Sequence, residues 1–297
     1  MNVPLPPPMH HRSILITGTS SGIGQATAIL LAKSGYTVFA GVRSPAAMDH
    51  LLALGFPNLI PIILDVNNAD HIAAAHTRIE QAVGDAGLMA LINNAGNGYS
   101  APTEYTDEAK ARELLDTHFW GMVNLTQQFI PLLRLYAAAN STHARIINVG
   151  SVSSISAFPF VQFYTAAKFA ILGFSEALRF ELDPQGIKVM VIISGAVKTR
   201  IWQRTGESAM ASLHRLPQQG VELYQDNLLA AKKLSSAVEA MGLTADKAAL
   251  VLKKALEAKN PGFKYFIGTD ARAVHFMIRY LPERLRHWLV RRQLKFK

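Results

Sequence analysis

The stretch SILITGTSSGIGQATAILLAKSG, residues 13–35, decides the fold. Its β-branched, apolar start over 13–18 predicts a strand, and the pattern over 22–35 predicts a helix that ends at a glycine. Between them lies the glycine-rich turn TGTSSGIG, residues 17–24. Glycines there let a pyrophosphate approach the backbone N–H groups at the start of the helix. A glycine-rich turn without a ligand is the alternative, but the strand–turn–helix context favours binding.

The same alternation of strand and helix continues along the chain. Strands are predicted at 36–42, 59–66, 88–96, 144–151, 187–195 and 263–268, and helices at 45–54, 69–83, 107–137, 162–183 and 244–258. Strands that are apolar throughout are typical of a parallel sheet covered on both faces. The sequence therefore predicts an α/β fold: a doubly wound, mostly parallel, Rossmann-like sheet within a single domain over 13–297.

Three segments stand outside this pattern. Residues 1–12 are rich in proline, and we expect a disordered, extended arm. Residues 201–242 are polar, helical and strandless, as expected of an insertion that covers a substrate. Residues 271–297 predict a basic helical extension at the C-terminus.

The basic extension holds most of the chain's net charge of +9. From Arg272 to Lys297 there are six Arg and two Lys against Glu283, a net charge of +7. Nucleic-acid-binding proteins usually spread such charge over a binding face, so we expect no nucleic-acid partner. The amphipathic run over 279–297 allows peripheral contact with an anionic membrane or a partner. We favour the alternative, a helix docked on its own domain, because docking requires the same apolar spacing.

Composition excludes several classes of function. There is no cysteine, which excludes disulfides, thiolate catalysis and thiolate metal sites, and no metal site is predicted. No apolar run reaches the ~18 residues that a membrane-spanning helix needs. The N-terminus lacks the apolar region of a secretory signal, so we expect a cytoplasmic protein, with the basic extension as its one potential link to a membrane.

A second motif, YTAAK, covers Tyr164 to Lys168. At positions i and i+4 the two side chains share one face of a helix. A lysine cation beside a phenol is expected to lower the phenol's pKa from about 10 and so to make it a proton donor and acceptor near neutral pH. Ser151 ends a predicted strand and is expected to reach the same pocket.

Together, TGTSSGIG, NNAG (93–96), GS (150–151), YTAAK and SGAVKT (194–199) resemble the motifs of the short-chain dehydrogenase/reductase family, over roughly residues 13–200. The segment after Lys168, with SGAVKT, resembles the branch of retinol and hydroxysteroid dehydrogenases. The resemblance implies that Tyr164 is the catalytic acid/base, that Lys168 holds the nicotinamide ribose, and that Ser151 binds the substrate oxygen. It implies contacts to the cofactor from Gly18, Ser20, Ser21, Gly22, Ile23, Gly24, Asp65, Val66, Asn93, Ala95, Gly96, Val197 and Thr199.

The end of the second predicted strand indicates which nicotinamide cofactor the protein prefers. A site that prefers NAD usually has an acidic residue at the end of the second strand, where this chain reads FAGVR. Arg43 instead offers a guanidinium for a 2′-phosphate, unless it is simply an exposed loop residue. We therefore expect NADP(H) rather than NAD(H). The substrate residues expected beside Ser151 are Phe158, Phe163 and Trp202, which favour a hydrophobic alcohol or carbonyl compound.

His118 departs from the family pattern. It lies on the apolar stripe of the predicted helix 107–137, where most histidines are neutral core residues. Family members commonly carry asparagine here, which holds a water that relays protons to the lysine and tyrosine. With a pKa near 6.5, a histidine either replaces that relay or breaks it.

Three functions remain open at this stage. The leading one is an NADP(H)-dependent oxidoreductase for a hydrophobic substrate. The others are a cofactor-binding regulator or sensor with little turnover, and a peripheral membrane protein acting through its basic C-terminus. The fold alone does not separate them. By resemblance, a homo-oligomer is expected to form through the helices at 107–137 and 162–183.

Overall fold

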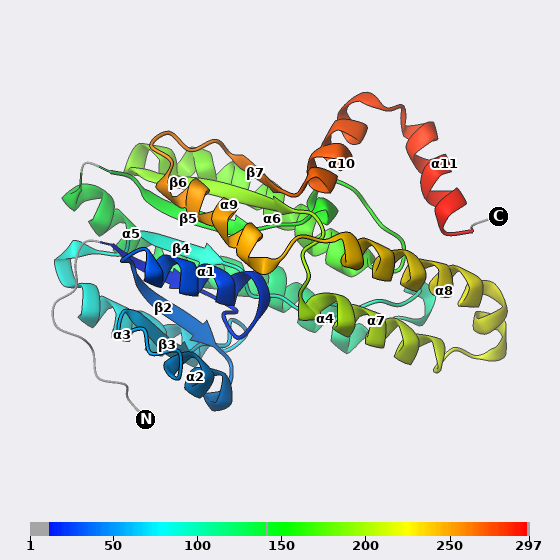
Figure 1. Cartoon of the computed structure of the whole chain (residues 1–297), viewed down its shortest axis with the longest axis horizontal. Helices are drawn as coiled ribbons and strands as arrows, with labels where there is room; N and C mark the ends of the chain where they lie inside the picture. The colour runs from blue at the N-terminus through cyan, green and yellow to red at the C-terminus, as the bar shows by residue number, and fades with distance from the viewer. Residues whose placement is uncertain (1–11, 141, 296–297) are drawn as a thin grey trace.

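A computed structural model describes residues 12–140 and 142–295. The predicted N-terminal arm lies outside the described residues except for Arg12. Figure 1 shows a seven-stranded sheet in the order β3-β2-β1-β4-β5-β6-β7, and every named pair of neighbouring strands is parallel. The strands are β1 (Ser13–Ile16), β2 (Thr37–Val42), β3 (Leu59–Ile63), β4 (Ala90–Asn93), β5 (Ala144–Val149), β6 (Ile187–Ser194) and β7 (Lys264–Ile267). The α/β prediction is confirmed.

The order of strands explains their composition. The central strands β1, β4 and β5 are buried along their whole length because helices cover both faces of the sheet. Pro61, which cannot donate a backbone hydrogen bond, lies on the edge strand β3 opposite Ala40. An edge strand tolerates proline because one of its two sides has no neighbour in the sheet.

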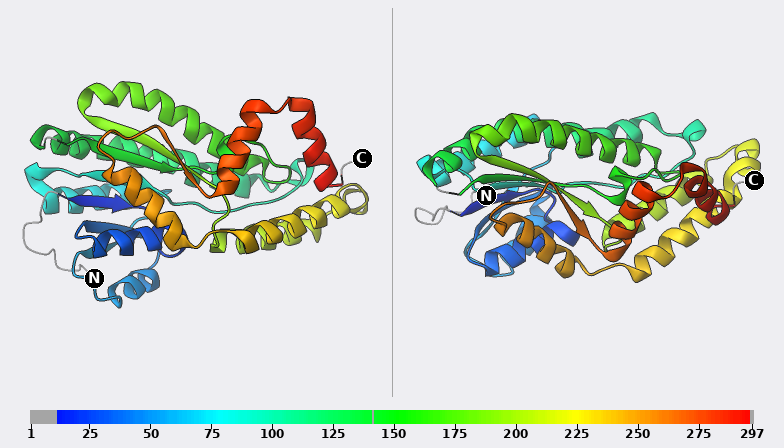
Figure 2. Two further views of the ribbon diagram at one scale, coloured as in Figure 1. Left: turned by 45° about the horizontal axis from the view of Figure 1, so that its top comes forward. Right: turned by 90° about the horizontal axis from the view of Figure 1, so that it is seen from above.

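Helices form one layer on each face, seen from above in Figure 2. Helices α1 (Gly22–Lys33) and α9 (Ala245–Glu257) pack together on one face, and α3 (Ala69–Val83), α5 (Gly121–Ala139) and α6 (Gln162–Leu182) lie on the other. The remaining helices are α2 (Pro45–Leu52), α4 (Glu108–Leu115), α7 (Arg200–Leu213), α8 (Gln218–Met241), α10 (Thr269–Tyr280) and α11 (Glu283–Gln293). Over the described residues, no helix is long and apolar enough to cross a bilayer.

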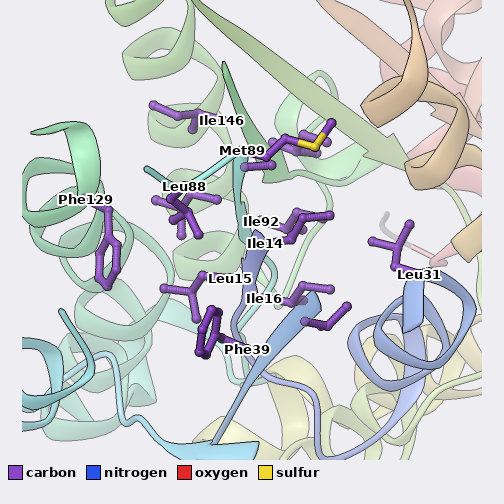
Figure 3. Packing of buried hydrophobic residues seen from close by; sticks show 14 of the residues in the cluster. Ile14, Leu15, Ile16, Leu31, Phe39, Leu88, Met89, Ile92, Phe129 and Ile146 are labelled. Carbon is purple, nitrogen blue, oxygen red and sulfur yellow. The ribbon is translucent and has the colours of Figure 1, made fainter. Parts of the chain in front are cut away.

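The core lies between the sheet and these two layers (Figure 3). Ile14, Leu15 and Ile16 of β1 are fully buried, and so are Phe39 of β2 and Phe129 of α5. Burial of each such side chain contributes about 1.5–3 kcal/mol to folding. This packing holds the carboxyl ends of the central strands in fixed register, and those ends carry the motifs.

One predicted element is wrong. The single helix expected over 107–137 is two helices, α4 and α5, joined by a π-helical turn, η3 (Asp116–Trp120). Pro131 lies within α5 without ending it. The sequence pattern did not indicate the π turn because apolar residues on either side of it keep a helical spacing.

Candidate active site

The glycine-rich turn follows β1 and is locked to the loop that follows β4. The Thr17 hydroxyl accepts hydrogen bonds from the backbone N–H groups of Asn94 and Ala95, both at 3.0 Å. The Asn94 amide donates in return to the carbonyl oxygens of Thr17 (2.9 Å) and Gly18 (3.1 Å). Sequence reasoning did not assign a role to Thr17 or Asn94, although both are polar residues placed directly at the ends of buried strands.

The shape of this turn fits a dinucleotide pyrophosphate. Gly18 and Gly22 adopt φ of +68° and +61°, which side chains disfavour, and a Cβ at Gly22 would lie 3.0 Å from Cγ2 of Thr199. Ser21 precedes α1, but its side chain caps none of the N–H groups in the first turn. Those N–H groups carry the positive end of the helix dipole.

A cavity of about 550 Å³ opens beside the start of α1. Ser21, Gly22 and Thr199 line it, together with the cationic side chains of Lys198 and Arg200 and, farther from the turn in sequence, the acidic side chains of Glu239 and Asp246. Backbone N–H groups that the Ser21 side chain leaves uncapped, with Lys198 and Arg200 nearby, suit the phosphates of a nicotinamide dinucleotide. Ser20 is exposed, Ile23 is partly buried, and Gly24 is buried close to the Asn94 amide, where a side chain would clash.

The predicted contacts to the adenosine end lie around the turn. Arg43 is exposed one residue after β2, and Thr19 binds the carbonyl oxygen of Gly41 through both its N–H (3.0 Å) and its hydroxyl (2.9 Å). Asp65 follows β3 and accepts a bond from the N–H of Asn67 (3.1 Å). Val66 is buried. The structure thus brings the ends of β2 and β3 beside the glycine-rich turn.

Helix α6 carries Tyr164 and Lys168 on one face, toward the end of β5. The Lys168 ammonium donates to the carbonyl oxygen of Val149 (2.8 Å) and lies 5.5 Å from the centroid of the Tyr164 ring. Ser151, two residues after β5, hydrogen-bonds Tyr164, and its hydroxyl also accepts from the N–H of Ser153 (3.1 Å). Three of the four predicted catalytic residues, Ser151, Tyr164 and Lys168, therefore lie together at the end of β5; the fourth is His118.

Burial governs the pKa values in this pocket. It lowers the pKa of Lys168 from 10.5 to about 7. It raises the pKa of Tyr164, and the hydrogen bond with Ser151 opposes that rise only in part. The expected lowering of the tyrosine pKa by the lysine is therefore wrong for these residues alone, because loss of hydration outweighs the other effects on the phenolate.

His118 lies in the π turn and points into the same pocket. Its side chain is buried, its Nε2 lies 2.8 Å from the Asn97 carbonyl oxygen, and its ring meets the Tyr164 ring edge-on with centroids 5.2 Å apart. Burial and, to a lesser extent, the charge of Lys168 lower its pKa to about 3. The expected pKa near 6.5 is wrong, so His118 is neutral at physiological pH.

Nε2 lies 2.8 Å from the Asn97 carbonyl oxygen and 3.1 Å from the Asn97 backbone nitrogen, so it donates to the first in one tautomer or accepts from the second in the other. No described residue hydrogen-bonds Nδ1. A small cavity of about 10 Å³, roughly the space of one water molecule, is lined by His118, Lys168 and Asn93 among others. The buried Oδ1 of Asn93 also has no partner among the described residues.

Asn93 contributes to the core as well as to this cavity. Its amide nitrogen donates to Thr126 (3.1 Å) and to Asn148 (2.8 Å), and Asn148 donates to Ser175 (2.8 Å). This buried chain of polar groups links β4 and β5 to α5 and α6. Sequence reasoning missed Thr126, Asn148 and Ser175, because nothing local distinguishes them from other polar residues in apolar elements.

The remaining predicted residues line the pocket from two loops. Ala95 lines the small cavity, and Gly96 lies against the His118 ring with no room for a Cβ. Val197 is buried, and its carbonyl oxygen accepts from the indole of Trp202 (2.8 Å). Asp270, at the start of α10, accepts from the N–H of Ala196 (2.6 Å) and so holds this loop; the sequence did not indicate it.

Two predicted substrate residues, Phe158 and Phe163, are partly buried aromatics. Phe163 packs with Tyr164 against a small buried cluster that contains Tyr99 and Leu114, so it contributes to the core. Phe158 lies in the segment before α6 and is partly buried.

The chain matches the family model described as short chain dehydrogenase over residues 12–209. The short-chain dehydrogenase ptmH of Penicillium ochrochloron is 40% identical over 196 residues, which cover 66% of this chain and 69% of that protein. The 3-ketodihydrosphingosine reductase of Bacteroides thetaiotaomicron is 30% identical over 285 residues, which cover 95% and 98%. Retinol dehydrogenase 16 of Rattus norvegicus is 28% identical over 281 residues, which cover 92% and 86%.

A crystal structure of a short-chain dehydrogenase from Streptomyces avermitilis superposes with a TM-score of 0.75 at 24% identity, covering 94% of this chain and 96% of that one. The fold is therefore shared over nearly the whole chain. With the family match and the meeting of Ser151, Tyr164 and Lys168 beside a dinucleotide-binding turn, the chain belongs to the short-chain dehydrogenase/reductase family, oxidoreductases that interconvert alcohols and carbonyl compounds with NAD(P)(H).

Proposed function

We propose that this protein is an NADP(H)-dependent oxidoreductase that interconverts a hydrophobic alcohol and its ketone or aldehyde. The observation that carries the proposal is the convergence of Ser151, Tyr164 and Lys168 at the end of β5, beside the glycine-rich turn. An intact set of proton-handling residues argues against a regulator without turnover, because such a protein has no use for it.

Tyr164, Ser151 and Lys168 have separate roles in the proposed reaction. A nicotinamide cofactor held by the turn would supply or accept the hydride. The Tyr164 hydroxyl gives a proton to the carbonyl oxygen during reduction and takes it back during oxidation. Ser151, already bonded to Tyr164, donates to the same oxygen and stabilises the charge that develops there. Lys168 is positioned by Val149 to stabilise the phenolate once Tyr164 has lost its proton.

His118 acts as a positioning residue in this scheme. Since it stays neutral, it does not deliver a proton by titrating near pH 7. Its ring instead supports Tyr164 edge-on, and its side chain lines the small cavity that Lys168 also lines.

The preference for NADP(H) rests on Arg43. It lies at the end of β2, exposed, and the residues that end this strand include no acid that would bind a ribose hydroxyl or repel a 2′-phosphate. A guanidinium binds a phosphate through two parallel hydrogen bonds, which makes Arg43 the natural partner.

The substrate class follows from the cover of the pocket. Helix α7 is tied to the loop after β4 because the Ser100 N–H donates to the Ser208 hydroxyl oxygen (3.2 Å) and the Ser212 hydroxyl donates to the Ser100 carbonyl oxygen (2.9 Å). Phe160 meets Tyr224 of α8 edge-on. We expect these residues, together with Phe158 and Trp202, to form an apolar cover over Ser151. The two relatives named for retinol and for 3-ketodihydrosphingosine agree with a bulky apolar substrate.

We also propose a homo-oligomer that pairs through α5 and α6. Large apolar side chains on these two helices are exposed, namely Leu135, Phe169 and Phe180. Burial of such side chains is what a stable interface requires. This proposal, like the cytoplasmic location, stays a prediction.

A cofactor titration combined with a carbonyl screen tests the proposed function. Purified protein is titrated with NADPH and NADH by fluorescence, then assayed with retinoids, steroids and other hydrophobic ketones and aldehydes. We expect tighter binding of NADPH, and Arg43→Ala is expected to weaken NADPH binding about tenfold or more while leaving NADH binding unchanged. Arg112→Ala, at an exposed arginine on α4, is the matched control. Equal affinity of the parent protein for both cofactors would refute the role of Arg43.

A further inference from the structure

The C-terminal helices α10 and α11 expose several large apolar side chains. Four large residues are well exposed: Phe276 (60%), Tyr280 (62%), Leu285 (42%) and Trp288 (51%). Ala271 is the one buried residue of α10, and α11 has none. The expected docking of this extension on its own domain is therefore only partial, because α11 contains no fully buried residue and stands away from the sheet in Figure 1.

Basic side chains accompany these apolar ones. Arg272 and Arg279 lie on α10, and Arg284, Arg286, Arg291 and Arg292 lie on α11, against the acids Asp270 and Glu283. Two of the arginines stack on the exposed aromatics: Arg279 lies 5.9 Å from the Tyr280 ring centroid, and Arg292 lies 5.3 Å from that of Trp288. Apolar anchors are thus interleaved with cations on the same two helices.

The structure also shows that this extension is held at both ends. At its start, Asp270 accepts from the N–H of Ala196 (2.6 Å) in the loop that lines the active site. At its end, Leu294 is buried, and its carbonyl oxygen accepts from the Asn227 amide of α8 (2.7 Å). The two helices therefore form a fixed platform beside the cover of the active site, as both views in Figure 2 show.

We propose that α10 and α11 form a docking surface for an anionic lipid bilayer. Tryptophan, tyrosine and phenylalanine side chains insert at the boundary between headgroups and acyl chains, and arginine side chains pair with anionic headgroups while their stems remain among apolar groups. A second copy of this chain fits the surface less well. A two-fold contact would bring two sets of arginines together, and like charges face each other at a cost.

Vesicle binding by the full-length protein tests the proposal. The protein is sedimented with vesicles of phosphatidylcholine alone and of phosphatidylcholine mixed with phosphatidylserine. We expect binding to the mixed vesicles that weakens with added salt, and little binding to neutral ones. Arg284→Gln is expected to reduce the partition coefficient roughly fivefold, whereas Arg112→Gln, at an exposed arginine on α4, leaves it unchanged.

Serine substitutions test the contribution of apolar side chains to vesicle binding, with a matched control on α2. Leu285→Ser and Trp288→Ser should each weaken vesicle binding severalfold, while Leu52→Ser, at an equally exposed leucine on α2, should not. Turnover of a water-soluble carbonyl substrate should be the same in all three variants, which separates this test from that of the proposed function. Absence of parent binding to either vesicle would overturn the proposal. Equal binding to both vesicles, or loss of self-association rather than of vesicle binding in Trp288→Ser, would also overturn it.

Discussion

Two helical segments face the same pocket, but their backbones are built differently. Helix α6 is regular over 21 residues and presents Tyr164 and Lys168 one turn apart. The segment that packs against it, α4 and α5, is interrupted by the π turn η3, which carries His118. Helix α6 thus places Tyr164 and Lys168 through the regular helical period. The π turn places His118 through a local departure from that period.

The difference shows what each backbone can do. A regular helix delivers two side chains to one face because positions i and i+4 coincide there. A regular helix fixes the direction of every side chain, so it could not also direct the His118 ring toward the loop that holds Asn97. The π turn inserts an extra residue, and it is here that His118 reaches the Asn97 carbonyl while its ring still meets Tyr164. Such turns are frequent at functional sites.

The largest expected effect is on the regular helix. Tyr164→Phe removes the proton donor, so kcat should fall about 10²- to 10⁴-fold while the affinity for NADPH, measured by fluorescence, is kept. Tyr280→Phe removes an exposed hydroxyl on α10 and should leave kcat unchanged. Turnover that survives Tyr164→Phe would break the assignment of α6 as the catalytic helix.

Two alanine substitutions compare the packing of the segments. A Cβ at Gly96 would run into the His118 ring, so Gly96→Ala should lower the free energy of unfolding by about 1–3 kcal/mol. Gly173 lies within α6 with open space around it, so Gly173→Ala should raise the same free energy by about 0.5–1 kcal/mol. Urea unfolding measures both. Equal effects of the two substitutions would mean that the π turn is not packed more tightly than the regular helix.

A further expected effect, seen only when the pH is changed, concerns the protonation of His118. Its pKa is about 3 in the folded protein and about 6.5 in the unfolded chain. The unfolded state therefore binds more protons between these values, and stability should fall as pH drops below about 6.5. From pH 7 to pH 5 the loss should be about 1–2 kcal/mol greater in the parent than in His118→Asn, measured by urea unfolding.

The pH dependence of kcat in His118→Asn tests the protonation state of His118 independently of stability. Since His118 is neutral from pH 5 upward, the inflections of kcat against pH over pH 5–9 should be the same in the parent and in His118→Asn. His50→Asn, at an exposed position on α2, is the control for both measurements. A new inflection near pH 6.5 that is present only in the parent would restore His118 as a titrating relay.

Local sequence was sufficient for most of the sheet and of the catalytic set. The helix over 69–83 was predicted with its observed bounds, and Tyr164, Lys168 and Ser151 meet as expected. Each of these depends on spacing along one element or on the end of one strand. The roles of Thr17 and Asn94 in holding the glycine-rich turn were not predicted, because their hydrogen bonds join residues that are 77 positions apart in the sequence.

By itself, the sequence determined the order of strands and helices, the glycine-rich turn and the i, i+4 pair on α6, since these depend on periodicity and on backbone freedom at a few residues. Only the tertiary structure decided the rest. The π turn, the neutral state of His118 and the exposed platform of α10 and α11 depend on which surfaces are buried against which. Burial, and not residue type, sets both the pKa of an imidazole and the availability of an apolar face.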